Sequence, residues 1–573
     1  AVMIVLKWYR IQDLPIHWSY RIKRDEIALV TDYNINDVLG TDALVKNQQK
    51  ELDLRAKLSE MYAIDLRNMS RSSIGKNLMT KFYSEWSGMP SYEFVDLRTE
   101  RSAVPIGKVV KDSIQFKTPF YRKILESIQR YSIYIGLGSP KQSELKRESI
   151  ANGIVVTTWR KSFQSLEFLS HDKGYTMAKG GLHSKDDPRV IWAESGEILA
   201  DPDVTSMYPS FIVEYGVAPH HLSKEVFIGI VKWLRETRVE AKHTGRKLEA
   251  DALKIVINRI YGALNDAMDY LYDPECTYTV TINLQLLLCG LIEAFELNNF
   301  DVLSANTDGL LVRLPLNRQD VFKHICNEWS VYSKLDLETE KFEKYCRSAV
   351  NDYIAVGYGF YDALQEYNRC GVWIDSKSNT YTTRQAIEDK FIKFKGYFLQ
   401  DPEYNKGFVY PVVKKALKEY FLYGVDITEF IRNYINTSRT AIYDYCFSQK
   451  VAGKYTTIYK TVRDGKPVYI KCQKHNRFYI CKSGGGAITK AIVPDSDNIA
   501  YGDDISGIVV EEEKSLVADQ RVALFNDYEY KEDYNLNYGF YINEVYKILY
   551  GNGKTGKGER RGINNNSNNL FGW

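Results

Sequence analysis

Two aspartates, each close behind a short apolar run, constrain this chain more than any other feature of its sequence. Residues 197–200 lead to Asp203, and residues 300–303 lead to Asn306-Thr307-Asp308-Gly309. Such runs predict short buried strands. A strand end holds a carboxylate on a rigid element, and two such carboxylates can bind a pair of hard divalent cations through oxygen alone. The pattern therefore indicates a site suited to two-metal phosphoryl transfer.

A predicted helix lies between these strands and carries three polar residues on one face. Lys254, Asn258 and Tyr261 are spaced i, i+4 and i+7, so their side chains share that face. A cation, an amide and an aromatic ring together suit a triphosphate and a base.

In this order, the stretches 203–210, 254–262 and 306–309 resemble motifs A, B and C of the family B DNA polymerases. Those motifs read Asp-x-x-Ser-Leu-Tyr-Pro-Ser, Lys-x-x-x-Asn-Ser-x-Tyr-Gly and Asp-Thr-Asp. The resemblance extends from residue 30 to residue 550 and is of the bacteriophage type. It implies an α+β, right-hand polymerase architecture: a palm with an antiparallel sheet, helical-hairpin fingers, a mixed thumb, and a remnant of an N-terminal 3′–5′ exonuclease domain.

The resemblance implies a catalytic role for Asp203 and Asp308, which would bind two Mg²⁺ ions, or Mn²⁺ in their place. The carbonyl of Val204 would supply a further oxygen ligand. Asp201 is a competing carboxylate, but its offset from Ser206-Met207-Tyr208 favours Asp203. Asn306 replaces the first aspartate of motif C, whereas the second, Asp308, is the metal ligand, so we expect an active enzyme. Gly309 is expected to allow a tight hairpin tip.

Residues 224–249 form a predicted basic amphipathic helix, for which a solvated charged face is the alternative interpretation. Within the resemblance it is the first fingers helix, and Arg238 and Lys242 match the Arg-x-x-x-Lys that reaches the incoming phosphates. Nucleotide-binding roles follow for a set of seven residues: Tyr208, Arg238, Lys242, Lys254, Asn258, Tyr261 and Gly262. Tyr208 resembles the ring that excludes a 2′-hydroxyl, although a core tyrosine is the alternative. Arg259 replaces the usual Ser and receives no role.

Contacts to DNA are implied for Gly180, Gly181, Thr307, Tyr353, Arg477, Tyr479 and Lys490. Two departures from the family accompany them. Ala178 stands where the family has Tyr before Gly-Gly, and Asn351 stands where it has the lysine of Lys-x-Tyr. A different residue must therefore contact the primer in place of that lysine. The separation of 51 positions between Asp203 and Lys254 suffices only for a helical hairpin. Within the resemblance this implies a nucleic-acid primer, because protein-primed relatives carry an extra subdomain there.

Tyr33 and Asp37 resemble the third exonuclease motif, although a surface pair is the alternative for so short a pattern. Residues 1–32 contain neither upstream acidic motif, so no complete proofreading site is expected. The predicted domains are 1–61 (exonuclease remnant), 62–150 (connecting region), 151–215 (palm), 216–261 (fingers), 262–345 (palm), 346–550 (thumb) and 551–573 (disordered tail). The apolar tip Leu570-Phe571-Gly572-Trp573 could dock to a sliding clamp.

Composition narrows the class without indicating an activity. The formal net charge is +3, so any DNA-binding groove must come from local patches. The eight cysteines lack paired zinc-site spacing, and no apolar run reaches membrane-spanning length. These features predict reduced thiols, a cytosolic setting and no membrane. The resemblance implies a monomer in the cytoplasm of the bacterial host of a phage, acting on primer-template DNA and dNTPs. Three alternatives stay open: a non-catalytic DNA-binding relative, a ribonucleotide-adding or RNA-directed polymerase, and a nuclease of another fold. A nuclease would not explain the basic side chains of the predicted fingers helices.

Overall fold

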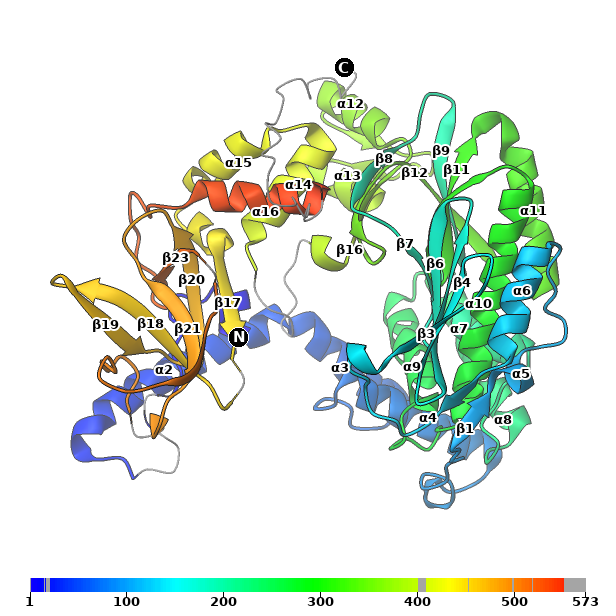
Figure 1. Cartoon of the computed structure of the whole chain (residues 1–573), viewed down its shortest axis with the longest axis horizontal. Coiled ribbons are helices and arrows are strands. Elements are labelled where there is room, and N and C mark those ends of the chain that lie inside the picture. The colour runs from blue at the N-terminus through cyan, green and yellow to red at the C-terminus, as the bar shows by residue number, and fades with distance from the viewer. Residues whose placement is uncertain are drawn as a thin grey trace.

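The structure is a computed structural model that describes residues 2–14, 16, 21–399, 409–451, 453–496, 499–517 and 519–550. It is a mixed α+β protein (Figure 1). The large sheet and its helices lie to the right in Figure 1, and two smaller sheets lie to the left. The predicted tail 551–573, including Leu570 to Trp573, lies outside the described residues.

The large sheet has the strand order β1-β2-β5-β6-β7-β10-β11-β9-β12-β13-β16, with β3, β4 and β8 attached at its sides. Its pairings are antiparallel except for β2 with β5. The strands are β1 (Ala103–Pro105), β2 (Ser132–Tyr134), β3 (Lys146–Ala151), β4 (Ile154–Trp159), β5 (Ser162–Ser170), β6 (Lys173–Ala178), β7 (Leu182–Lys185), β8 (Arg189–Trp192), β9 (Glu197–Val204), β10 (Asp301–Asn306), β11 (Gly309–Pro315), β12 (Leu337–Ala349), β13 (Asp352–Gly357) and β16 (Ile392–Lys395).

One face of this sheet is covered by α10 (Pro274–Leu297), which is apolar on all sides and therefore buried. Asp273 caps its N-terminus and proline occupies its first turn. By length and composition α10 could cross a membrane, which differs from the sequence expectation. However, 78% of its apolar window is buried inside the protein, as expected for a core helix. The same core contains α5 (Ile106–Val109), α6 (Pro119–Gln129), α7 (Met207–Glu214) and α11 (Gln319–Ser333).

A helical hairpin connects the first and second parts of the sheet. It consists of α8 (Lys224–His243) and α9 (Lys247–Leu264), which pack against each other and against α4 (Arg71–Ser87). Gly75 of α4 lies against Arg259 of α9, where an added Cβ would be 2.7 Å from the arginine Cβ. Arg259, which had no predicted role, thus belongs to the junction between α4 and α9, and it also pairs with the buried Asp269 at 2.5 Å.

The remaining elements form a second core. Its helices are α12 (Phe360–Cys370), α13 (Arg384–Phe391), α14 (Pro411–Tyr423), α15 (Ile427–Asn433) and α16 (Tyr538–Tyr550). One small sheet contains β17 (Cys446–Lys450), β20 (His475–Cys481) and β23 (Arg521–Leu524), and another contains β18 (Thr456–Arg463), β19 (Lys466–Lys471), β21 (Ala487–Ile492) and β22 (Glu511–Ser515). The two-residue strands β14 (Trp373–Ile374) and β15 (Thr380–Tyr381) pair with each other.

Two predicted domain boundaries differ from the structure. The predicted palm-to-thumb boundary at residue 346 falls inside β12, and β13 and β16 continue the large sheet beyond it. Residues 2–13, assigned to the exonuclease remnant, instead contribute α1 (Val2–Val5) to the second core, where Lys7 pairs with Asp444 at 2.6 Å. From there α2 (Ile27–Asn47) and α3 (Gln49–Tyr62) run towards α4 (Figure 1). The pairing of β13 with β16 and the ion pair between Lys7 and Asp444 join residues far apart in the chain, so no local sequence pattern indicates them.

Candidate active site

The two predicted carboxylates lie at adjacent strand ends in the centre of the large sheet. Asp203 near the end of β9 is the backbone partner of Gly309, the first residue of β11. The amide of Val204 donates a 2.8 Å hydrogen bond to the carbonyl of Asp308, at the tip of the β10–β11 hairpin. Antiparallel pairing therefore brings together two acids that are far apart in the sequence.

Gly309 is required for a different reason from the one predicted. The hairpin tip has its positive φ at Thr307, at 50°. At Gly309, an added Cβ would lie 2.9 Å from Asp203 Oδ1 and 3.0 Å from the Pro202 carbonyl. A side chain at residue 309 would thus push the two strands, and with them the two carboxylates, apart.

Asp201, Asp203 and Asp308 line one cavity, together with Lys393 and Lys395. Burial, followed by the negative charges of Asp308 and Asp201, raises the pKa of Asp203 to about 7. Burial also raises the pKa of Asp201 to about 7. Buried like charges favour neutralisation by a proton or a cation. An oxygen-only donor set with excess negative charge fits Mg²⁺ or Mn²⁺, and Asp203 with Asp308 would hold it.

This electrostatic arrangement predicts how pH and metal affect stability. Because folding raises the pKa of Asp203 from 3.8 to about 7, the folded state binds more protons within that window. The metal-free protein therefore loses this contribution as pH rises through about 7. Mg²⁺ should then raise the melting temperature clearly at about pH 8 and little at about pH 6. Calorimetry would measure both, and Asp203→Asn should abolish the difference; an equal shift in this variant would contradict the assignment.

The cavity contains two lysines that the sequence analysis missed. Lys393 and Lys395 alternate along β16 and face Ala355 and Tyr353 of β13. Lys393 Nζ donates to Glu340 at 2.7 Å, and Lys395 Nζ lies 5.7 Å from the ring centre of Tyr353. The alternation in residues 391–395 was the available signal, but only strand pairing shows that these two lysines reach the cavity. Tyr353 is buried, stacks on Tyr345 at 4.7 Å and lines the same cavity.

The Gly180–Gly181 turn lies against motif C. An added Cβ on Gly181 would be 3.1 Å from Thr307 Oγ1, and the amide of Thr307 donates to the Leu182 carbonyl at 2.8 Å. Thr307 Oγ1 is also 2.9 Å from His183 Nε2. The structure thus places three of the residues predicted to contact DNA, Gly180, Gly181 and Thr307, beside the carboxylate hairpin.

Motifs A and B meet through two tyrosines. The rings of Tyr208 and Tyr261 are stacked at a centroid distance of 4.0 Å and an angle of 5°. Arg238 of α8 reaches the same turn, where its Nη1 donates to Ser206 Oγ at 3.3 Å. The left-handed conformation of Ser206, with φ 49°, forms this turn between β9 and α7.

Lys254 and Asn258 line a cavity other than the one between the carboxylates. It measures about 470 Å³ and lies between α9, α3 and the start of α4, where Arg71 and Glu51 also line it. Lys242 and Gly262 are exposed on the hairpin. The predicted nucleotide-binding residues therefore lie in three places: the turn after motif A, this larger cavity and the exposed surface of the hairpin. Sequence spacing could not distinguish them.

The predicted DNA contacts in the thumb require a correction. Arg477 is 0% exposed, and its guanidinium donates to the carbonyls of Trp8, Tyr9, Phe525 and Asn526. Tyr479 is 4% exposed in the same core. Both side chains are thus unavailable to DNA, because Arg477 is bound to backbone carbonyls of the N-terminal segment and Tyr479 packs against Phe525 and Tyr534. Lys490 is half-buried on β21, 5.0 Å from the ring centre of Tyr455.

Tyr33 and Asp37 lie one turn apart on α2, Tyr33 half-buried and Asp37 exposed. Burial, then the charge of Asp37, raises the pKa of Tyr33. Beside them Asn36 is buried and accepts a hydrogen bond from Trp8 Nε1 at 2.9 Å. The exonuclease assignment of this pair stays a prediction.

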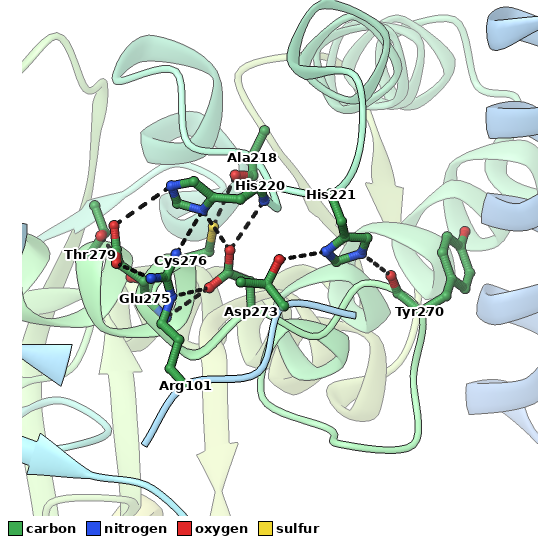
Figure 2. A network of polar contacts seen from close by, with 10 residues as sticks. Arg101, Ala218, His220, His221, Tyr270, Asp273, Glu275, Cys276 and Thr279 are labelled. Carbon is green, nitrogen blue, oxygen red and sulfur yellow. Dashed lines mark hydrogen bonds and ion pairs between the residues drawn. The ribbon is translucent and has the colours of Figure 1, made fainter. Parts of the chain in front are cut away.

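One group among the described residues has the composition of a metal site: His220, Asp273 and Cys276 (Figure 2). Arg101 already supplies the positive charge, since its Nε donates to Asp273 Oδ1 at 3.1 Å. Cys276 Sγ donates to the Ala218 carbonyl at 3.1 Å, and burial raises the pKa of this thiol. Because a protonated thiol and an arginine oppose cation binding, we interpret this group as a structural junction at the start of α10.

Comparison with known proteins gives distant similarities. No protein-family model matches the chain. DNA polymerase II of Escherichia coli (strain K12) is 28% identical over 118 residues, which are 21% of this chain and 15% of that enzyme. The solved structure of the family B DNA polymerase from the hyperthermophilic archaeon Pyrobaculum calidifontis aligns with 98% of this chain and 62% of its own at 12% identity and a TM-score of 0.38. The chain thus spans less than two thirds of either protein, and its sequence similarity is to a DNA polymerase.

Proposed function

We propose that this protein is a template-directed DNA polymerase of family B that extends a nucleic-acid primer with dNTPs. The observation that carries the proposal is the convergence of Asp203 and Asp308 on one cavity, from two strands whose ends are held together by backbone pairing. Paired carboxylates at such a position suit phosphoryl transfer. The sequence similarity to a DNA polymerase over 118 residues supports the same reaction class.

Asp203 and Asp308 would hold two Mg²⁺ ions, with the Val204 carbonyl as a further ligand. When bound, the metal lowers the cost of deprotonating the primer 3′-hydroxyl and neutralises charge on the departing pyrophosphate. The protein aligns the primer end and the triphosphate and keeps both carboxylates rigid. Gly309 contributes by letting β9 and β11 approach closely.

Arg238, Lys242, Lys254 and Asn258 would bind the triphosphate, and Tyr261 and Gly262 would line the new base pair. A planar guanidinium such as that of Arg238, beside the turn after motif A, suits bidentate phosphate binding. The primer strand would pass Gly180, Gly181, Thr307 and Tyr353, with Lys393 and Lys395 in place of the lysine missing at residue 351. Lys490 would contact the duplex backbone.

A primer-extension assay on the full chain tests the proposal. A labelled primer annealed to a longer template, with dNTPs and Mg²⁺, should be extended to the template end. The second candidate is a non-catalytic DNA-binding relative, which Asn306 favours. Tight primer-template binding with no extension would establish that alternative, and a preference for rNTPs or an RNA template would establish the ribonucleotide-adding one.

Substitution of Tyr208 tests sugar selection. If its ring lies beneath the deoxyribose, Tyr208→Ala should raise the rNTP-to-dNTP ratio of kcat/KM by roughly 10- to 200-fold. Tyr208→Phe keeps the ring and the stack on Tyr261, so it should discriminate as the wild type does. Steady-state incorporation of single nucleotides would measure both variants. An unchanged ratio in Tyr208→Ala would mean that this tyrosine is part of the core.

The biological setting forms part of the proposal. The protein would replicate a bacteriophage genome as a monomer in the bacterial cytoplasm, and Leu570 to Trp573 would dock to a sliding clamp. Tyr33 and Asp37 would belong to an exonuclease motif. Clamp pulldown with and without the last four residues tests the docking segment.

A further inference from the structure

We propose that Asp186, Lys173, Arg189 and Arg347 form a positioning cluster. The cluster fixes the position of β10 and thereby that of Asp308 in motif C. The inference rests on the proposed function, in which Asp308 is a metal ligand. None of these four residues belongs to a sequence motif. They lie after β7, on β6, on β8 and on β12, and they converge on β10 just before the hairpin that carries Asp308.

The cluster caps one backbone carbonyl. Leu303 O accepts from Lys173 Nζ at 2.8 Å, from Arg189 Nη2 at 3.0 Å and from Arg347 Nη2 at 3.3 Å. The pairing of β10 with β11 shifts register between Val302 and Ser304, which marks a bulge at Leu303. A bulge leaves a backbone group unpaired and re-aims the strand. Three cationic donors thus satisfy the group that the bulge exposes.

Asp186 holds these donors in place. Its carboxylate lies 2.7 Å from Arg347 Nη2, 3.1 Å from Lys173 Nζ and 3.9 Å from Arg189 Nη2. It also accepts from the hydroxyl of Ser184. Ser184 Oγ in turn accepts from the amide of Ala305 at 3.0 Å. One carboxylate therefore links the carbonyl of Leu303 with the amide two residues further along β10.

These side-chain bonds replace a missing part of the backbone ladder. Among the described residues, β7 and β10 share the single backbone pair Asn306 with His183. Elsewhere along this seam, the contacts of Ser184 and of the cations hold β10 against β7. On the side facing β7, residues 303–305 of β10 are therefore held by side chains, and Asp308 lies five residues beyond the capped carbonyl.

Burial shows that Arg347 and Asp186, the two central residues of the cluster, do not contact DNA. Arg347 is 1% exposed, and the side chain of Asp186 is 4% exposed. Nε and Nη1 of Arg347 have no hydrogen-bond partner among the described residues. Buried ion pairs with unsatisfied donors add little net stability compared with an apolar core. What this cluster provides is a fixed geometry for β10.

Asp186→Asn tests the inference, because it removes the central charge without changing the shape of the side chain. Backbone amide hydrogen exchange of the metal-free variant should be faster than that of the wild type in residues 303–309. This measurement does not depend on polymerase activity. In primer extension, the half-saturating Mg²⁺ concentration should rise roughly ten-fold or more, as for other residues that orient metal ligands, while KM for dNTP stays within about two-fold. Ser184→Ala, a milder change, should accelerate exchange at Ala305 in the same direction.

Glu388→Gln is the matched control. Glu388 is 3% exposed and is likewise surrounded by cations, Lys418 and Arg384, but in the second core. The Glu388→Gln substitution should leave hydrogen exchange in residues 303–309 and the half-saturating Mg²⁺ concentration unchanged. The inference would be overturned if residues 303–309 of Asp186→Asn exchanged at the wild-type rate. Equal acceleration of exchange in Asp186→Asn and Glu388→Gln would also overturn it. If the wild type fails to extend primers, the proposed function is wrong, and the exchange data still decide the role of the cluster.

Discussion

Replacing Asp308 with alanine should abolish primer extension while leaving DNA binding nearly unchanged. Loss of one of the two carboxylates that line the cavity should lower kcat by at least roughly 10³-fold, about 4 kcal/mol of transition-state stabilisation. Removal of a like charge near Asp203 should also lower the pKa of that carboxyl, because Asp308 helps to raise it. The metal-free variant should therefore be at least as stable as the wild type above about pH 7.

Two further variants sharpen this experiment. Asp301→Asn alters an exposed carboxylate at the opposite end of β10 and should extend primers normally. Asn306→Asp restores the acid usual in the resembling family and should remain active. Single-turnover kinetics and fluorescence anisotropy with labelled primer-template would separate chemistry from binding. Extension by Asp308→Ala at the wild-type rate would refute the assignment of the active site.

Replacing Arg477 with methionine should destabilise the second core strongly. The guanidinium donates at 2.7 Å to the Phe525 carbonyl and at 2.6 Å to the Trp8 carbonyl, and it lies 4.5 Å from the ring centre of Tyr443. Methionine would fill similar space but leave these buried carbonyls unpaired. We expect the free energy of unfolding to fall by roughly 3–5 kcal/mol.

The matched control for this variant is Arg463→Met on β18, where the arginine is exposed. It should change stability by no more than about 0.5 kcal/mol. Scanning calorimetry of the two variants would measure the difference. If Arg477→Met instead weakened primer-template binding at unchanged stability, Arg477 would contact DNA as the sequence resemblance implied.

The sequence was most informative where chemistry is encoded locally. Strand-end positions of Asp203 and Asp308 followed from short apolar runs, and the shared face of Lys254, Asn258 and Tyr261 followed from helical periodicity. It was least informative where a residue type fits two environments. An arginine on a strand suits a DNA backbone or a set of buried carbonyls, and the pattern around Arg477 did not distinguish them.

By itself, the sequence determined the strands that present the two carboxylates, the helical hairpin over α8 and α9, and the presence of Asn306 in motif C. The tertiary structure decided which lysines approach those carboxylates, why residue 309 must be glycine, and how a bulge at Leu303 is held. The physical reason is that periodicity and turn chemistry depend on neighbours in the chain. Strand register, burial of charge and side-chain capping depend instead on residues brought together only by folding.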